Sequence, residues 1–243
     1  MLNDKQDAFG HLLYDFYRGA ETQEIIERDD GMIADGGGPE SYFAPFTEWP
    51  EYQRQAMDYV NGRVLDIGCG AGRAALHLQQ RGHKVVAIDN SPLAVKTCKQ
   101  RGVRTAKIIA ATQVKKQLGL FDTILMLGNN FGLMENEKRA RWMLRRFASM
   151  TDHDGRIVAE SLNPYDTNDP IHRRYHRRNR ARGRMAGQVR IRVRHSIYAT
   201  PWFDYLLVSK SEMKRLVVGT PWNVEAFIDS DGPSYVAVLS KAA

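Results

Sequence analysis

The chain has 243 residues, of which 43% are hydrophobic and 26% charged, as in a soluble globular domain with elaborations. No apolar run approaches the roughly 18 residues that span a membrane, and the first ten residues lack the pattern of a secretion signal, so no membrane partner is expected. The two cysteines have no metal-ligand spacing and do not predict a disulfide framework, which favours a reducing, cytoplasmic location.

The positive charge is concentrated in one segment. The net charge is +7, and residues 173–194 contain ten arginines and no acid. Subtracting these ten charges leaves the rest of the chain at −3. A local anionic partner is therefore favoured over general nucleic-acid binding.

From residue 62 to about 161, short apolar runs alternate with helical stretches, which predicts βαβ units and a parallel sheet. The helices are expected to begin near Gly72 and Ser91, with a third over 140–147, where apolar residues recur at i, i+3, i+4 and i+7. The expected strands are 63–67, 84–88, 104–109, 121–127 and 156–160.

Outside this core the pattern changes. Residues 9–18 are expected to be helical, and the segment 189–195 alternates apolar residues with arginines, which predicts a strand with the apolar residues inward. A capping box at 209–212 predicts a helix that ends near residue 219. Two closing strands are expected at 222–228 and 235–239. We predict one domain over 1–243, with an extension or lid (1–61), a core (62–161), a basic insertion (162–205) and a closing helix and strand pair (206–243).

The stretch VLDIGCGAGR at 64–73 carries the main chemical signal. A strand leads into a tight turn that needs glycine, and the following helix begins with unpaired N–H groups. Dinucleotide sites share such glycine patterns. However, Asp66 stands two residues before the first glycine, where a carboxylate can hold an ammonium group. Arg73 stands where the dinucleotide fingerprint has a glycine, so a nicotinamide dehydrogenase is disfavoured.

Asp89 ends the second strand, 23 residues after Asp66. An acid at this place can accept hydrogen bonds from both ribose hydroxyls. The alternative is helix capping, because Asn90 and Ser91 follow. With the glycine turn upstream, ribose binding is the favoured interpretation.

These residues resemble the class I methyltransferases that use S-adenosyl-L-methionine (SAM) and release S-adenosyl-L-homocysteine. The resemblance covers about residues 62–161 and 209–240. It implies an α/β, Rossmann-like, seven-stranded and mostly parallel sheet with an antiparallel last strand and helices on both faces. It places the turn around the methionine part of SAM and Asp89 on the ribose. The predicted cofactor contacts are Asp66, Gly68, Cys69, Gly70, Asp89, Asn90, Thr112, Gln113, Gly128 and Asn129.

One departure concerns the adenine. Such enzymes often place an acid after the third strand, whereas this chain has Ala110-Ala111-Thr112-Gln113. Either Thr112 or Gln113 substitutes for it, or backbone groups contact the adenine.

The acceptor is expected beyond the ends of the fourth and fifth strands, because ligands of open α/β sheets bind there. Residues 127–132 and 160–166 are loosely similar to small-molecule, glycine-type N-methyltransferases. Asn163-Pro164-Tyr165 also resembles the Asn/Asp-Pro-Pro-aromatic motif of enzymes that methylate amines in nucleic acids, but it lacks the second proline and follows another strand. The predicted catalytic residues are Asn129, Glu160 and Asn163, and the predicted substrate contacts are Asn130, Tyr165, Arg190, Arg192 and Tyr198.

The arginine segment has two interpretations: a solvated basic cover, or a site for a carboxylate or phosphate of the acceptor. In the second, Arg190, Arg192 and Arg194 form one patch. His172 and His176 are four residues apart, but the surrounding arginines oppose metal binding, so no metal is predicted.

We therefore predict methyl transfer to a nitrogen or oxygen of a small anionic metabolite. A hydroxyl acceptor would need a general base, and Glu160, Asp166, His172 and His195 all remain open. The alternatives are an RNA or other nucleic-acid methyltransferase that uses the arginine segment, and a non-catalytic SAM-binding protein. The sequence leaves the acceptor itself and the oligomeric state open.

Overall fold

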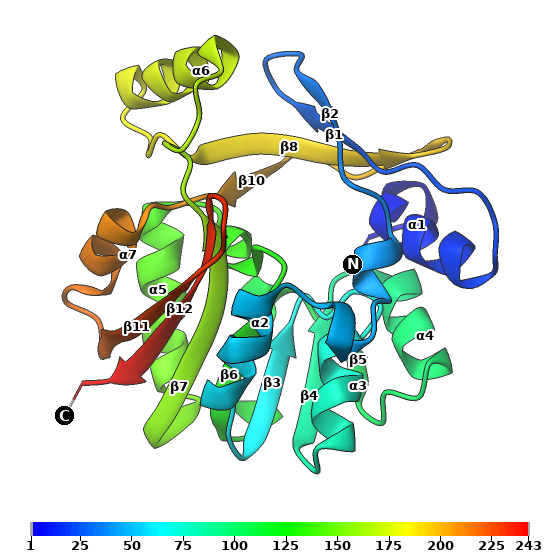
Figure 1. Ribbon diagram of the computed structural model, residues 1–243, viewed down its shortest axis with the longest axis vertical. Coiled ribbons are helices and arrows are strands. Elements are labelled where there is room, and N and C mark those ends of the chain that lie inside the picture. The colour runs from blue at the N-terminus through cyan, green and yellow to red at the C-terminus, as the bar shows by residue number, and fades with distance from the viewer. Residues whose placement is uncertain (1, 243) are drawn as a thin grey trace. The chain divides into compact units, whose positions relative to one another are not determined.

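A computed structural model describes residues 2–242 of the chain (Figure 1). The chain divides into two compact units. Unit 1 holds the residues up to Trp49, Val64–Val114 and Arg190–Phe203, and unit 2 holds Pro50–Arg63, Lys115–Val189 and the residues from Asp204 on. Over residues 2–242, no helix has both the length and the apolar character needed to cross a membrane.

Seven strands form one sheet in the order β11-β12-β7-β6-β3-β4-β5. The pairs β4–β5 and β6–β7 are parallel, whereas β12, the last strand of the chain, is antiparallel to both β7 and β11. The predicted seven-stranded sheet with an antiparallel last strand is therefore confirmed. The strands are β3 (Arg63–Ile67), β4 (Lys84–Asp89), β5 (Ala106–Ile108), β6 (Phe121–Met126), β7 (Thr151–Leu162), β11 (Trp222–Asp229) and β12 (Ser234–Lys241).

In unit 1, α3 (Arg73–Gln80) follows β3 and α4 (Pro92–Gln100) follows β4. The cap of α4 is the predicted one: the Ser91 hydroxyl accepts a hydrogen bond from the Ala94 N–H at 2.9 Å. Helix α1 (Ala8–Tyr17) packs against α4. The Asp7 carboxylate joins these two helices, because it accepts hydrogen bonds from the N–H groups of Gly10 and Leu93.

A second sheet has the strand order β10-β8-β1-β2, with β9 paired to β8. Residues 191–194 of β8 lie antiparallel to β1, and β1 lies antiparallel to β2. Of the three apolar residues expected inward on β8, Val193 is buried, while Val189 and Ile191 are partly exposed. The strands are β1 (Ile25–Arg28), β2 (Ile33–Asp35), β8 (Gln188–His195), β9 (Tyr198–Ala199) and β10 (Phe203–Leu206).

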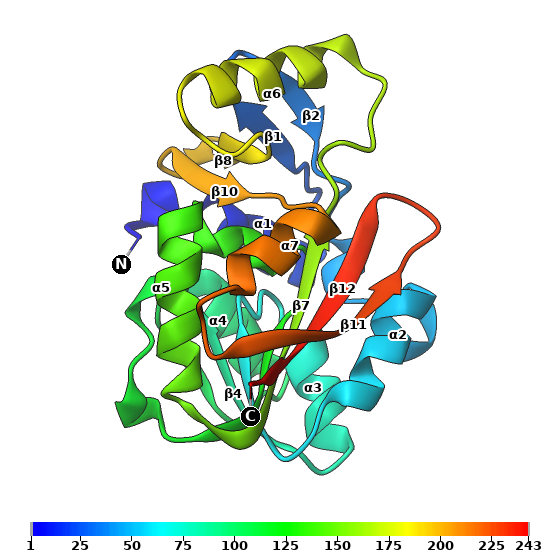
Figure 2. The same ribbon diagram turned by 90° about the vertical axis from the view of Figure 1, so that its left-hand side faces the viewer.

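Unit 2 contains α2 (Glu51–Ala56), α5 (Glu137–Ala148), α6 (Pro170–Ala181) and α7 (Lys210–Val217). The apolar face predicted for α5 is buried in full. Helices α5 and α7 lie side by side (Figure 2), and the Arg141 side chain joins them by donating to the carbonyls of Arg215, Leu216 and Val218. Short 3₁₀ helices complete the chain: Asp4–Gln6, Glu40–Tyr42, Phe46–Glu48, Met57–Tyr59, Ala111–Gln113, Lys116–Leu118 and Asn130–Met134.

Candidate cofactor and acceptor sites

The turn between β3 and α3 requires its glycines. Gly68, Gly70 and Gly72 have φ angles of 72°, 52° and 81°, in the left-handed region that disfavours other residues. A Cβ atom at Gly72 would also lie 2.6 Å from the Cys98 sulfur. The N–H groups of Gly68 and Cys69 both donate to the Ile88 carbonyl, which ties the start of the turn to β4.

Asp66 lies at the end of β3 with 3% of its surface exposed. Its Oδ2 atom is buried and has no hydrogen-bond partner within residues 2–242. Burial, followed by the charge of nearby Asp89, raises the pKa of this carboxyl to about 7, while Arg73 and the Ala75 N–H oppose the shift. A buried carboxylate oxygen without a partner fits the ammonium group of a SAM molecule, which would supply the missing donor.

Asp89 orients the same turn from the end of β4. Its carboxylate accepts from the Gly70 N–H and from the Ser91 N–H, each at 3.0 Å. Burial raises its pKa to about 6, and these backbone donors oppose the shift. The side-chain cap of α4 is Ser91, so the capping role considered for Asp89 belongs to that residue. Each carboxylate oxygen keeps lone pairs that a ribose hydroxyl could use.

Cys69 and Cys98 meet behind the turn, a contact that their 29-residue separation gave no reason to expect. Their sulfur atoms lie 3.5 Å apart, both residues are buried, and the Cys98 thiol donates to the Gly70 carbonyl. The hydrogen bond with Cys98, and then burial, raise the pKa of the Cys69 thiol. The Cys69 side chain thus faces Cys98, and a contact of Cys69 with the cofactor stays a prediction.

The predicted adenine contacts lie after β5. Thr112 is partly exposed and Gln113 exposed, in the 3₁₀ helix Ala111–Gln113. Asn90 is likewise exposed, directly after Asp89. Contacts of these three residues with the cofactor stay predictions.

The N-terminal segment covers the turn within unit 1. Phe9, Tyr42 and Phe43 pack against a cluster formed by Leu13, Ala71 and Ala94. The Arg101 guanidinium fixes this cover, since it donates to the Ala71 carbonyl at 2.6 Å and to the carbonyls of Tyr42 and Phe43. The sequence indicated aromatic residues here, but no local signal placed them on the turn.

In unit 2, the chain turns sharply after β6. Gly128 and Asn129 have positive φ angles of 68° and 61°. The Tyr205 hydroxyl donates to the Asn129 carbonyl at 2.5 Å, while the Asn129 side-chain oxygen is buried without a partner among the described residues. Asn130 begins the following 3₁₀ helix.

Glu160 holds the other end of this turn. It is 2% exposed and accepts hydrogen bonds from the Tyr52 hydroxyl, the Gln53 amide and the Gly128 N–H at 2.9, 2.8 and 2.7 Å. This arrangement suits a carboxylate that positions the Gly128 backbone. A catalytic role for Glu160 stays a prediction.

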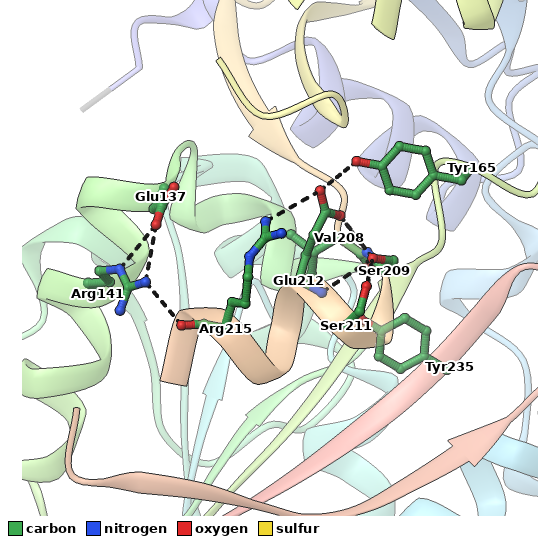
Figure 3. A network of polar contacts seen from close by, with 9 residues as sticks. All are labelled: Glu137, Arg141, Tyr165, Val208, Ser209, Ser211, Glu212, Arg215 and Tyr235. Carbon is green, nitrogen blue, oxygen red and sulfur yellow. Dashed lines mark hydrogen bonds and ion pairs between the residues drawn. The ribbon is translucent and has the colours of Figure 1, made fainter. Parts of the chain in front are cut away.

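Asn163 and Tyr165 lie just beyond β7, where the Asn163 side chain accepts from the Tyr165 N–H at 3.2 Å. The Tyr165 hydroxyl turns toward α7 and donates to Glu212 at 2.6 Å (Figure 3). Burial, followed by the contacts with Glu212, raises the Tyr165 pKa to about 12. Its ring is edge-on to His176, and no group of three metal-ligating side chains occurs within residues 2–242.

The predicted acceptor residues of the arginine segment belong to unit 1. Arg192 donates to Glu27 at 2.7 Å, and its guanidinium lies 4.8 Å from the centre of the Trp202 ring. Arg190 is exposed, and the Tyr198 ring stacks on His11 with 3.5 Å between centroids. Substrate binding by these residues stays a prediction.

His195 and His172, the two histidines considered as general bases, lie in different surroundings. His195 is buried, and its Nε2 atom lies 3.0 Å from an Asp15 oxygen while Nδ1 faces the Gln23 carbonyl. This places it between β8 and the end of α1. His172, with Asp166, belongs to unit 2, and His172 lies in the first turn of α6.

Comparison with known proteins adds independent findings. A family described as a methyltransferase domain matches residues 64–155. The chain is 30% identical over 110 residues to a glycine/sarcosine N-methyltransferase from Halorhodospira halochloris, covering 43% of this chain and 41% of that protein. It is 48% identical over 99 residues to the 2-heptyl-1-hydroxyquinolin-4(1H)-one methyltransferase of Mycobacteroides abscessus, covering 41% and 37%. The chain thus spans less than half the length of these two relatives.

A solved structure resembles nearly the whole chain. It is a SAM-dependent methyltransferase from Bacteroides fragilis in complex with S-adenosyl-L-homocysteine, with a TM-score of 0.85 and 24% identity, covering 100% of this chain and 98% of that one. At this identity the likeness concerns the fold. With the glycine turn and the strand order, these similarities lead to one conclusion: residues 64–155 match a methyltransferase domain in a chain with the fold of a SAM-dependent methyltransferase, and SAM is the cofactor of this domain.

Proposed function

We propose that this protein transfers the methyl group of SAM to a nitrogen or oxygen atom of a small anionic metabolite. The observation that carries the proposal is the end of β3, where a buried Asp66 oxygen has no partner among residues 2–242 and lies beside a turn that requires glycines. The relatives named for glycine or sarcosine and for a hydroxyquinolone act on small molecules, which supports a small acceptor here.

The residues of the chain bind and orient. When bound, SAM supplies an activated methyl group on a positively charged sulfur. Asp66 is suited to hold the ammonium group of the methionine part, and Asp89 to hold the ribose while it keeps the turn in shape. Phe9 and Tyr42 cover the turn and exclude water from it. Positioning and a dry site are the main contributions that such a displacement needs.

Calorimetric titration with SAM, S-adenosylhomocysteine and NAD tests the cofactor assignment. We expect both adenosyl compounds to bind the wild type and Asp89→Ala to weaken both by roughly ten-fold or more, since one charge-assisted hydrogen bond contributes about that factor. Label transfer from methyl-labelled SAM to a panel of amines, carboxylic acids and phenols then tests turnover. Cofactor binding without turnover on the panel would support the non-catalytic alternative.

The anionic character of the acceptor is a separate part of the proposal. Arg190 and Arg192 lie on β8, and Arg192 already forms an ion pair with Glu27. Replacing both arginines with glutamine should raise the acceptor KM strongly and leave cofactor affinity unchanged. Arg174→Gln with Arg178→Gln, two exposed arginines of α6, is the matched control. An unchanged KM in the Arg190 and Arg192 double variant would exclude these residues as an anion site.

Methyl transfer to RNA is the second candidate. One observation favours it: α6 contains five arginines and no acid, and all five are exposed. Phosphate contacts release counterions, so binding to a 20-nucleotide RNA should then fall steeply between 50 and 200 mM salt. Weak binding with little salt dependence would leave the small acceptor as the better proposal.

A further inference from the structure

Glu24 in unit 1 is a buried carboxylate with one oxygen left without a donor among the described residues. This residue is 4% exposed, and its Oε2 atom is buried without a hydrogen-bond partner within residues 2–242. The other oxygen accepts from the Tyr42 hydroxyl at 3.4 Å, which is a long contact. A buried carboxylate normally has several donors, because water that is lost must be replaced. Neither the glycine turn nor the arginine segment accounts for Glu24.

The position of Glu24 links it to the cofactor turn. It directly precedes β1, which in unit 1 lies beyond the carboxyl ends of β3 and β4 (Figure 1), where ligands of such sheets bind. Tyr42, its hydrogen-bond partner, packs against the cluster of Leu13, Ala71 and Ala94, which includes a residue of the turn, and lies edge-on to Phe9. Tyr42 therefore links Glu24 to the cluster beside the cofactor turn.

The charges around Tyr42 support the same placement. Burial raises the pKa of both the Tyr42 hydroxyl and the Asp66 carboxyl, and Arg73, the first residue of α3, opposes both shifts, so it lies within electrostatic reach of both groups. Arg73 thus connects the surroundings of Asp66 with those of Tyr42, which is the hydrogen-bond partner of Glu24.

We propose that Glu24 is an acceptor-side group: its free oxygen accepts a hydrogen bond from the N–H or O–H of the methyl acceptor and takes up the proton released on transfer. In this step the acceptor lone pair forms a bond to the methyl carbon, the carbon–sulfur bond breaks, and its electrons remain on sulfur as a neutral thioether. The acceptor proton moves to the Glu24 carboxylate and then to solvent. This inference rests on the proposed function and names the substrate class as acceptors with a transferable proton.

The protonation of Glu24 is consistent with that role. Burial, with a smaller contribution from Asp35, raises its pKa to about 7, and the Tyr42 hydrogen bond opposes the shift. A base that titrates near neutral pH can take a proton and release it again. The titratable groups that act on Glu24 are the Tyr42 hydroxyl and Asp35, and Arg73 acts on Tyr42.

Sinefungin tests the placement without a known acceptor. This SAM analogue carries a primary ammonium group on carbon where SAM carries its methylated sulfur, so the ammonium points to the acceptor position. Calorimetry should compare sinefungin and S-adenosylhomocysteine on the wild type, Glu24→Gln and Glu21→Gln, an exposed carboxylate three residues away. We expect Glu24→Gln to lower the affinity for sinefungin by about ten-fold or more and to leave the affinity for S-adenosylhomocysteine unchanged. Glu21→Gln should leave the affinity for both ligands unchanged.

The pH dependence gives a second readout. The preference of the wild type for sinefungin over S-adenosylhomocysteine should rise through pH 7 as Glu24 ionises, and should be flat in Glu24→Gln. Asp66 also titrates near pH 7, but both ligands carry the same methionine-type ammonium, so its effect cancels in the ratio. Equal weakening of both ligands by Glu24→Gln, or no weakening of either, would overturn the proposal. If neither ligand binds the wild type, both the proposed function and the proposed role of Glu24 fail. If both ligands bind the wild type and Glu24→Gln leaves the ratio of their affinities unchanged, only the proposed role of Glu24 fails.

Discussion

The ionised Asp66 carboxylate is suited to bind the cofactor, but its burial lowers the stability of the folded protein. Its unfolded carboxyl has a pKa of 3.8 and the folded one about 7, so folding favours the protonated form. The contribution of this carboxyl to the free energy of unfolding is fully present below about pH 4 and is lost as the pH rises through 7. Asp66→Asn should therefore raise the free energy of unfolding of the ligand-free protein at pH 8, by about 1–3 kcal/mol, and by less at pH 5. Thermal unfolding at both values measures this, and the same variant should bind S-adenosylhomocysteine weakly. A stability gain independent of pH would contradict the explanation.

Glu160 offers a contrasting case, because its buried carboxylate has its donors in place. Glutamine has one acceptor oxygen and would turn an N–H₂ group toward donors, so Glu160→Gln should lower the free energy of unfolding by about 2–4 kcal/mol. Glu225→Gln is the control, since Glu225 forms a partly exposed pair with Arg156 and should change stability by under about 1 kcal/mol. Denaturant titration checks both. A Glu160→Gln protein of normal stability that has lost turnover would instead support the catalytic role predicted from sequence.

The sequence predicts where a residue lies when a turn or a strand end defines its surroundings. The positions of Asp66 and Asp89 beside the glycine turn could be predicted in this way, while their contacts with the cofactor stay predictions. Two of the donors to Glu160 come from Tyr52 and Gln53, more than 100 residues away, and no local sequence pattern predicts these contacts. Glu24 likewise lies in a segment without a motif, and its unusual feature is one buried oxygen that has no partner among the described residues.

At the scale of elements, α7 shows how one residue can serve two contacts. Glu212 completes the predicted capping box with Ser209 and also accepts from the Tyr165 hydroxyl (Figure 3). Glu212→Ala should lower the free energy of unfolding by about 1–3 kcal/mol, because it removes a cap and leaves a hydroxyl without its partner. Glu137→Ala, which breaks an exposed pair with Arg141 on α5, should cost under about 1 kcal/mol. Equal losses in denaturant titration would show that the Glu212 contacts contribute little.

The elements that the sequence predicted share a strong apolar period. Strands β3 and β4 and helix α5 were identified because their buried residues are apolar and regularly spaced. Helix α6 was not predicted, because its buried residues are Tyr175, His176 and Asn179, and no apolar stripe exists. Asn179 instead fixes the helix end by donating to the carbonyls of Ala186 and Gln188.

At the scale of the whole molecule, cofactor binding should appear as stability. A ligand that binds only the folded protein adds RT ln(1 + [L]/Kd), about 2.7 kcal/mol at a concentration of 100 Kd. The residues proposed to bind the cofactor, Asp66 and Asp89, both have raised pKa values, about 7 and about 6, and carboxylates accept hydrogen bonds best when ionised. The melting temperature should therefore rise with S-adenosylhomocysteine concentration, and rise more at pH 8 than at pH 5.5. Asp66→Asn should remove most of that pH dependence, whereas Asp122→Asn, on β6, should retain it. A ligand-induced shift of equal size at both pH values would mean that the cofactor binds without drawing on these two carboxylates, and the assignment of the site to the ends of β3 and β4 would then fail.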